Sequence, residues 1–119
     1  MGRHKTPIER DAFKMLSLID DVVNVMPKDR KHTTGQKIFN LALEFWDDIV
    51  VANDYSLKRE VTLEGARSKL NKIEVLLKMS HEKGYISPQH YIDLSEIVER
   101  IAKQQASWYK ATVNRRESD

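Results

Sequence analysis

The residues that could perform acid–base or metal chemistry are four histidines and two pairs of adjacent carboxylates. Catalysis and metal binding both need such side chains to converge on one point. No two histidines are spaced to share a helix face, and the adjacent residues Asp20-Asp21 and Asp47-Asp48 would diverge by about 100° on a helix. No glycine-rich phosphate loop is present in the sequence. The histidines are His4, His32, His81 and His90. We therefore predict that the protein is not an enzyme and has no catalytic residue, metal or cofactor.

A basic segment gives a stronger signal. Residues 28–37 contain four Lys or Arg residues and one acid, a local charge of +3. We expect a loop here before a helix N-terminus, where free backbone N–H groups and the helix dipole favour phosphate. A solvated connection would explain the same charges, but cations on later helices could extend a nucleic-acid track. The predicted nucleic-acid-binding residues are Lys28, Arg30, Lys31, His32, Lys37, Lys69, Lys72, Arg100 and Lys103.

Several large apolar residues fall outside the main apolar stripes. Phe13 lies opposite the stripe of the first predicted helix, and Val75 and Met79 lie opposite that of the third. The second helix has an apolar arc of about 200°, wider than a surface helix needs. Such faces favour self-association or a partner protein, with core packing as the alternative for Trp108. Gln105 lies within the last stripe and needs a hydrogen-bond partner if buried. The predicted oligomer or partner contacts are Phe13, Phe39, Trp46, Val75, Met79 and Trp108.

Helical periodicity positions all of these residues. Apolar side chains recur at spacings of three and four along most of the chain. Thr6-Pro7 and Ser87-Pro88 have the cap-then-proline order of a helix start, and Gly84 provides a stop signal. The chain is therefore expected to be all-α, an up-down-up-down antiparallel four-helix bundle. The predicted helices cover about residues 7–26, 35–54, 61–83 and 88–113, with a frayed tail at 114–119.

Length and composition agree with a single domain over residues 1–119. The chain is 40% hydrophobic and 32% charged, with a net charge of +2 that permits nucleic-acid contact without requiring it. No apolar run approaches the roughly 18 residues of a membrane span, and no signal peptide is evident. The absence of cysteine excludes a disulfide scaffold, a zinc ribbon and a thiol nucleophile. We expect a cytoplasmic protein with no membrane contact.

Three motifs, taken in order, resemble one known family. Residues 27–38 read Pro-Lys-Asp-Arg-Lys-His-Thr-Thr-Gly-Gln-Lys-Ile, similar to a Pro-Lys-x-x-Arg-x-x-x-Gly segment between its first two helices. The segment from Ala66 to Leu77 looks like its third-helix signature, and residues 85–91, followed by Trp108, resemble its fourth helix. The family is the accessory variability determinant of diversity-generating retroelements. It is related to the four-helix-bundle proteins encoded in bacterial 23S rRNA intervening sequences.

The resemblance implies a homopentameric ring without catalytic activity. Such a ring would bind a reverse transcriptase and template RNA or cDNA, and so support mutagenic reverse transcription. The motif carries Lys28, Arg30 and Gly35 over to this role. The intervening-sequence relatives imply instead an RNA-associated role that needs no polymerase. Two further alternatives stay open. A structural oligomerisation module would be favoured if the protein does not bind RNA at low salt. A metal-carrying or enzymatic bundle would be favoured if stoichiometric iron or manganese co-purifies with the protein.

Overall fold

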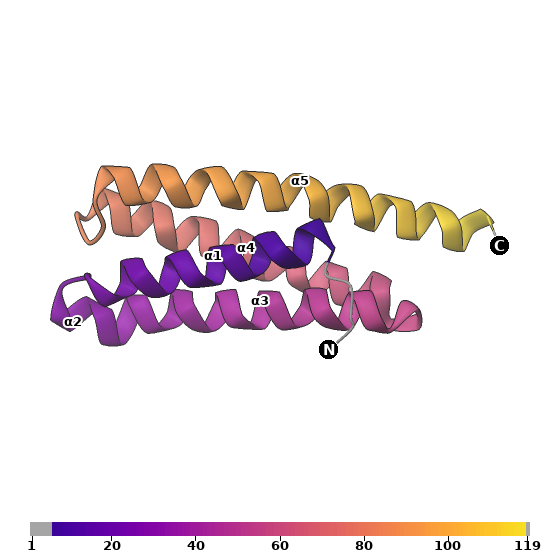
Figure 1. Cartoon of the computed structure of the whole chain (residues 1–119), viewed down its shortest axis with the longest axis horizontal. Coiled ribbons are helices and arrows are strands. Elements are labelled where there is room, and N and C mark those ends of the chain that lie inside the picture. Colours follow the sequence, from indigo (N-terminus) through magenta and orange to yellow (C-terminus); the bar gives the residue numbers. More distant parts are fainter. Residues whose placement is uncertain (1–5, 119) are drawn as a thin grey trace.

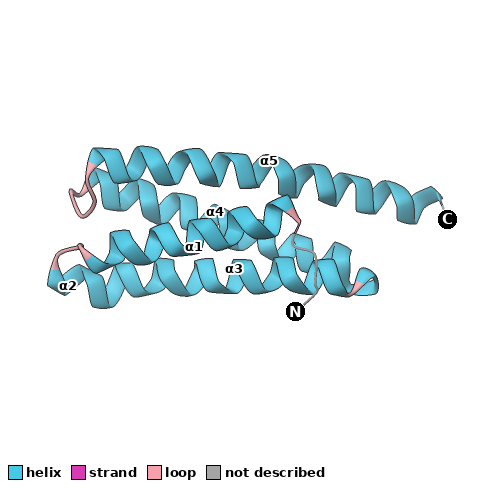
Figure 2. Cartoon of the chain, viewed as in Figure 1, coloured by secondary structure: helices cyan, strands magenta, loops and turns pink. Residues whose placement is uncertain are grey.

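Four long helices lie side by side in the computed structural model of the chain, which describes residues 6–118 (Figure 1). Each helix runs antiparallel to the previous one, and both α1 and α4 pack against α3 and α5. Short connections join the helices (Figure 2), and the bundle measures 51 × 30 × 21 Å. The predicted all-α four-helix bundle is therefore confirmed. The helices are α1 (Pro7–Asn24), α3 (Gln36–Asp54), α4 (Arg59–Glu82) and α5 (Pro88–Ser118).

Capping side chains set the two proline-led helix starts. The Thr6 Oγ1 atom accepts a hydrogen bond from the Glu9 backbone N–H at 3.3 Å, one turn into α1. The Ser87 Oγ atom accepts in the same way from the His90 N–H at 3.1 Å, at the start of α5. Just after the C-terminus of α4, Gly84 has a φ of 75°, a backbone conformation that favours glycine. The local start and stop signals in the sequence thus operate as predicted.

The core consists of one apolar stripe from each helix. Phe45 and Met15 are among its largest side chains, and both are fully buried. The apolar arc of α3 continues beyond this core, where Phe39 and Trp46 are half-buried and Leu43 is exposed. The stripes are Ile8, Ala12, Met15, Ile19 and Val22 on α1; Ile38, Leu41, Ala42, Phe45 and Ile49 on α3; Leu63, Ala66, Leu70, Ile73 and Leu77 on α4; and Leu94, Ile97, Val98 and Ile101 on α5.

The connection between α1 and α3 is helical, which corrects the predicted basic loop. Helix α2 (Lys28–Arg30) continues through a π-helical turn, η1 (Lys31–Gly35), directly into α3. The backbone N–H groups of Arg30 and Lys31 both donate to the Pro27 carbonyl at 2.8 Å. These two groups are therefore already hydrogen-bonded, and the first helical turn after α1 begins at Lys28 and not at Gln36.

Gly35 explains why the turn packs so tightly against the end of α1. This residue is buried and has ordinary helical dihedral angles, φ −60° and ψ −45°. A Cβ atom built on it would lie 2.8 Å from the Val23 Cγ1 atom and 3.0 Å from the Met26 sulfur. The glycine is thus needed because the Val23 and Met26 side chains pack directly against the backbone of η1, and not for an unusual conformation.

Helices α4 and α5 differ in extent from the ranges predicted for them. A 3-10 turn, η2 (Ser56–Lys58), precedes α4, which begins at Arg59 and not at residue 61. Helix α5 continues to Ser118, so the predicted frayed tail from residue 114 is wrong over the part that the structure describes. Arg116 pairs with Glu60 at 2.6 Å and fastens this last part of α5 to α4. Helix α5 has 31 residues against 18 in α1, so it projects past the bundle (Figure 1).

Candidate nucleic-acid interface

Four of the predicted nucleic-acid-binding residues gather at one end of the bundle, on α2 and η1. Lys28, Arg30 and His32 are exposed there, and Lys31 is half-buried. The connection between α4 and α5 lies at the same end (Figure 1), and it places the Tyr85 ring 5.1 Å from the Arg30 guanidinium carbon. We call these five residues the basic end: Lys28, Arg30, Lys31, His32 and Tyr85.

The charges of the basic end are only weakly engaged by the protein. Arg30 lies 3.7 Å from Asp29, and both side chains are well exposed. The Lys31 ammonium lies 3.5 Å from the Asn24 side-chain oxygen, a long hydrogen bond. Lys28 and His32 form no ion pair with any residue between 6 and 118. Exposed pairs of this kind contribute at most about 1 kcal/mol, so these cations are available to an external anion.

Three other predicted cations form ion pairs within the bundle, two of them between helices. Lys69 on α4 pairs with Asp48 on α3 at 2.7 Å, and neither side chain is fully exposed. Lys103 lies 3.4 Å from Glu99, one turn earlier on α5. The third, Arg100, joins α5 to α1 as described next. Lys69 and Arg100 therefore have a stabilising role between helices, whereas the Lys103 pair is exposed and lies within one helix.

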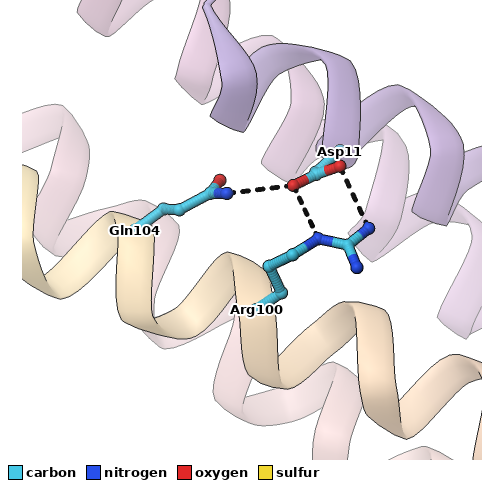
Figure 3. A network of polar contacts seen from close by, with 3 residues as sticks. All are labelled: Asp11, Arg100 and Gln104. Atoms are coloured by element: carbon cyan, nitrogen blue, oxygen red, sulfur yellow. Dashed lines mark hydrogen bonds and ion pairs between the residues drawn. The ribbon is translucent and has the colours of Figure 1, made fainter.

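The Arg100 contact is a small polar network between α1 and α5 (Figure 3). Its guanidinium donates two hydrogen bonds to the Asp11 carboxylate, at 3.0 and 3.1 Å, and Gln104 donates a third at 3.0 Å. The hydrogen bond from Arg100 lowers the pKa of Asp11, against the opposing effect of burial, and the one from Gln104 lowers it further. The same pairing raises the pKa of Arg100. The network fixes the two helices that are farthest apart in the sequence.

The last two predicted cations, Lys37 and Lys72, lie together, and Lys37 follows the η1 turn by two residues. They line a shallow hollow of about 400 Å³ between α3 and α4. Val75, one of the predicted partner contacts, lines the same hollow and is 66% exposed. The structure thus joins two residues predicted to bind nucleic acid with one predicted to contact protein.

The other predicted partner contacts divide into exposed and core-packed residues. Phe13 is 54% exposed on α1. Phe39, Trp46 and Trp108 are half-buried and pack against the core, and Met79 is also half-buried. Trp108 additionally has the Arg59 guanidinium 5.4 Å above its ring. Trp108 therefore packs partly against the core, as the alternative to a partner contact predicted.

Polar side chains form hydrogen bonds between helices inside the bundle. The Gln105 side-chain amide N–H donates to the Leu63 carbonyl at 2.7 Å, whereas the buried side-chain oxygen of Gln105 has no hydrogen-bond partner among residues 6–118. The Asn53 amide likewise donates to the buried Glu9 carboxylate at 2.9 Å and to the Thr6 hydroxyl at 3.1 Å. These contacts stabilise the α1–α3 and α4–α5 packing.

The histidines do not converge. The His81 ring stacks on the Tyr91 ring with centroids 4.4 Å apart, His32 is exposed, and His90 is half-buried. His4 lies outside the described residues. Within residues 6–118 no group of three or more His, Asp or Glu could hold a metal ion. Over the same range no helix is both long and apolar enough to cross a membrane.

Sequence reasoning missed the contact between Tyr85 and Arg30. The two residues belong to different connections, the first and the third. In an up-down-up-down bundle these connections lie at the same end, so the predicted topology could have paired the aromatic ring with the cations. No spacing rule within one helix would have found it.

The fold is similar to a solved structure. A protein of unknown function from the S23 ribosomal protein family of Bacteroides thetaiotaomicron superposes with a TM-score of 0.78. The match covers 87% of this chain and 98% of that chain, at 15% sequence identity. No family model matches the sequence, and no curated protein does. At this identity the likeness concerns the fold, so the chain is a four-helix bundle with the architecture of that S23-family structure.

Proposed function

We propose that this chain is a non-catalytic accessory protein that binds nucleic acid through its basic end. The observation that carries the proposal is the group of exposed cations on α2 and η1, beside Tyr85. Lysine and arginine side chains bind phosphates without reading sequence, and aromatic rings contact unstacked bases. A rigid bundle that presents such an end can hold a single-stranded template without performing any reaction.

The more specific form of the proposal is an accessory subunit of a diversity-generating retroelement. The motifs at residues 27–38 and 85–91, which resemble that family, coincide with the two connections that form the basic end. In this role the protein binds the reverse transcriptase together with template RNA or cDNA. It acts as a homopentamer, for which the exposed Phe13 offers subunit-contact area. Sedimentation of the purified protein tests the pentamer directly.

A second candidate is an RNA-associated protein of the 23S rRNA intervening-sequence type. The observation that favours it is the similarity to the S23-family structure at a TM-score of 0.78. Affinity purification from the native host, with and without nuclease, separates the two candidates. A reverse transcriptase that stays bound after nuclease supports the retroelement role. Ribosomal proteins that are lost with nuclease support the second candidate.

Binding of labelled single-stranded RNA at several salt concentrations tests the basic end itself. Replacing Lys28, Arg30 and Lys31 together by alanine should weaken binding and reduce the slope of log K against log salt by about 2, at roughly 0.7 per lost phosphate contact. Thermal stability should change little, because the contacts of these side chains are exposed. The control removes the same charge at the opposite end, with Lys58, Lys110 and Arg115 replaced by alanine. Equal losses in both triple variants would contradict a localised site.

A further inference from the structure

We infer that the hollow between α3 and α4 is a docking groove for an acidic amphipathic helix of a partner protein. This inference rests on the proposed function in one respect, namely that the bundle works by binding another protein. The groove has a volume of about 400 Å³. The residues that carry the argument are Lys37 and Leu41 on α3 and Lys72, Val75 and Leu76 on α4.

The floor of the groove is apolar. Leu41 is buried, Leu76 is half-buried and packs on the core, and Val75 is 66% exposed. Nucleic-acid backbone gains little from such a floor, because phosphates and sugars are polar. Apolar side chains of a partner would gain about 25 cal/mol for each Å² removed from water. The floor therefore favours a protein occupant over RNA.

Two lysines are among the residues that line the groove. One lysine comes from each helix, Lys37 from α3 and Lys72 from α4. Neither has an acidic residue three or four positions away in the sequence. Within residues 6–118 neither forms an ion pair, in contrast to Lys69 one turn from Lys72. Two uncompensated lysines beside an apolar floor fit carboxylates that flank an apolar ridge.

The length of the groove suits a helix. Its lining on α4 extends from Ser68 to Leu76, about 12 Å at 1.5 Å per residue. An amphipathic helix presents apolar side chains at i, i+3 and i+7 over a similar length. Acidic residues on either side of that ridge would reach Lys37 and Lys72. The remaining lining residues, Ser68 and Asn71, are uncharged and add no preference of sign.

Fluorescence anisotropy with a designed peptide tests this inference on the full chain. The probe is a labelled helical peptide of about 16 residues, with leucine at i, i+3 and i+7 and glutamate on both flanks. A second probe has lysine in place of every glutamate. We expect the acidic peptide to bind and the basic peptide to bind at least about tenfold more weakly, because like charges oppose it. No binding of the acidic peptide, or equal binding of both, overturns the inference.

The variants locate the peptide. Val75→Asp should weaken binding of the acidic peptide by about tenfold or more, since it places a carboxylate on the apolar floor. Val61→Asp is the matched control, because Val61 is on the same helix with the same 66% exposure and does not line the groove. The charge reversal Lys37→Glu with Lys72→Glu should have an effect like that of Val75→Asp. Equal losses in Val75→Asp and Val61→Asp contradict the assignment.

Two further outcomes would assign the groove to another occupant. If the double lysine reversal weakens RNA binding and Val75→Asp does not, the groove is part of a nucleic-acid track. If Val75→Asp, and not Val61→Asp, dissociates an oligomer in sedimentation, a second copy of the chain covers it. The alanine triple variant of the basic end separates the two proposals. Loss of RNA binding there, with no peptide binding to the wild-type protein, overturns this inference and leaves the proposed function standing.

Discussion

Replacing Gly35 by alanine should destabilise the bundle, although alanine normally favours a helix over glycine. The added Cβ would lie 2.8 Å from Val23 Cγ1 and 3.0 Å from the Met26 sulfur. The methionine side chain is flexible and can move away. Val23 is β-branched with a stiff side chain, so it cannot rotate freely to make room. The end of α1 and the η1 turn must therefore separate slightly.

The expected magnitude is the difference between two opposing effects. Gly35 has helical dihedral angles, so alanine contributes about 1 kcal/mol through helix propensity. Overpacking a tight contact costs about 1–3 kcal/mol. The net loss in the free energy of unfolding should be about 1 kcal/mol. For a domain of this size, that corresponds to a decrease of about 4 °C in Tm.

Urea unfolding followed by circular dichroism measures this difference, with Gly65→Ala as the matched control. Gly65 is exposed within α4, and a Cβ there would meet no atom within 4 Å. Its replacement should therefore stabilise the protein by about 1 kcal/mol. Combining Gly35→Ala with Val23→Ala should relieve the contact. The double variant should therefore lose less free energy of unfolding than the sum of the losses in the two single variants. The reasoning is refuted if Gly35→Ala stabilises the protein as much as Gly65→Ala does.

Three more predictions concern the contacts between helices. The pKa of Asp11 is lower in the folded protein than in the unfolded chain, where it is about 3.9. The contribution of Asp11 to stability is therefore present above the unfolded pKa and is lost as the pH falls through the folded pKa. Asp11→Asn should consequently lower stability at pH 7 and reduce the further loss below about pH 4, as measured by urea unfolding at both pH values. Gln105→Ala should cost about 2 kcal/mol in the same assay, because it removes a buried hydrogen bond and leaves a cavity, whereas Gln105→Leu should cost less. Glu60→Gln should accelerate amide hydrogen exchange in the last turns of α5 near Arg116 and leave the middle of the helix unchanged.

The fold was predictable from the sequence because its signals are local. Thr6-Pro7 and Ser87-Pro88 begin helices through hydrogen bonds that span three residues. The buried apolar stripes follow from the period of 3.6 residues per turn of the α-helix. A bundle with short connections then has few possible topologies.

The features that were missed depend on contacts between distant parts of the chain. Asp11 and Arg100 are 89 positions apart, and Glu60 and Arg116 are 56 apart, so no spacing rule could pair them. Without its contact to Glu60, the tail after residue 113 reads as polar and frayed. The contact of Gly35 with Val23 likewise joins η1 to a different helix, α1, so the pattern within one helix could not reveal it. The way in which the predicted cations divide among the basic end, the hollow between α3 and α4, and ion pairs within the bundle required the tertiary structure.

The length of α5 keeps the electrostatics of the two ends of the bundle separate. The helix begins beside the basic end and extends for 31 residues, about 46 Å at 1.5 Å per residue. The Debye length at physiological ionic strength is about 8 Å. Charges near Arg115 and Arg116 therefore lie several screening lengths from Lys28 and Arg30. A polyanion that approaches one end responds to the local charge there, and the modest net charge of +2 of the whole chain says little about either end.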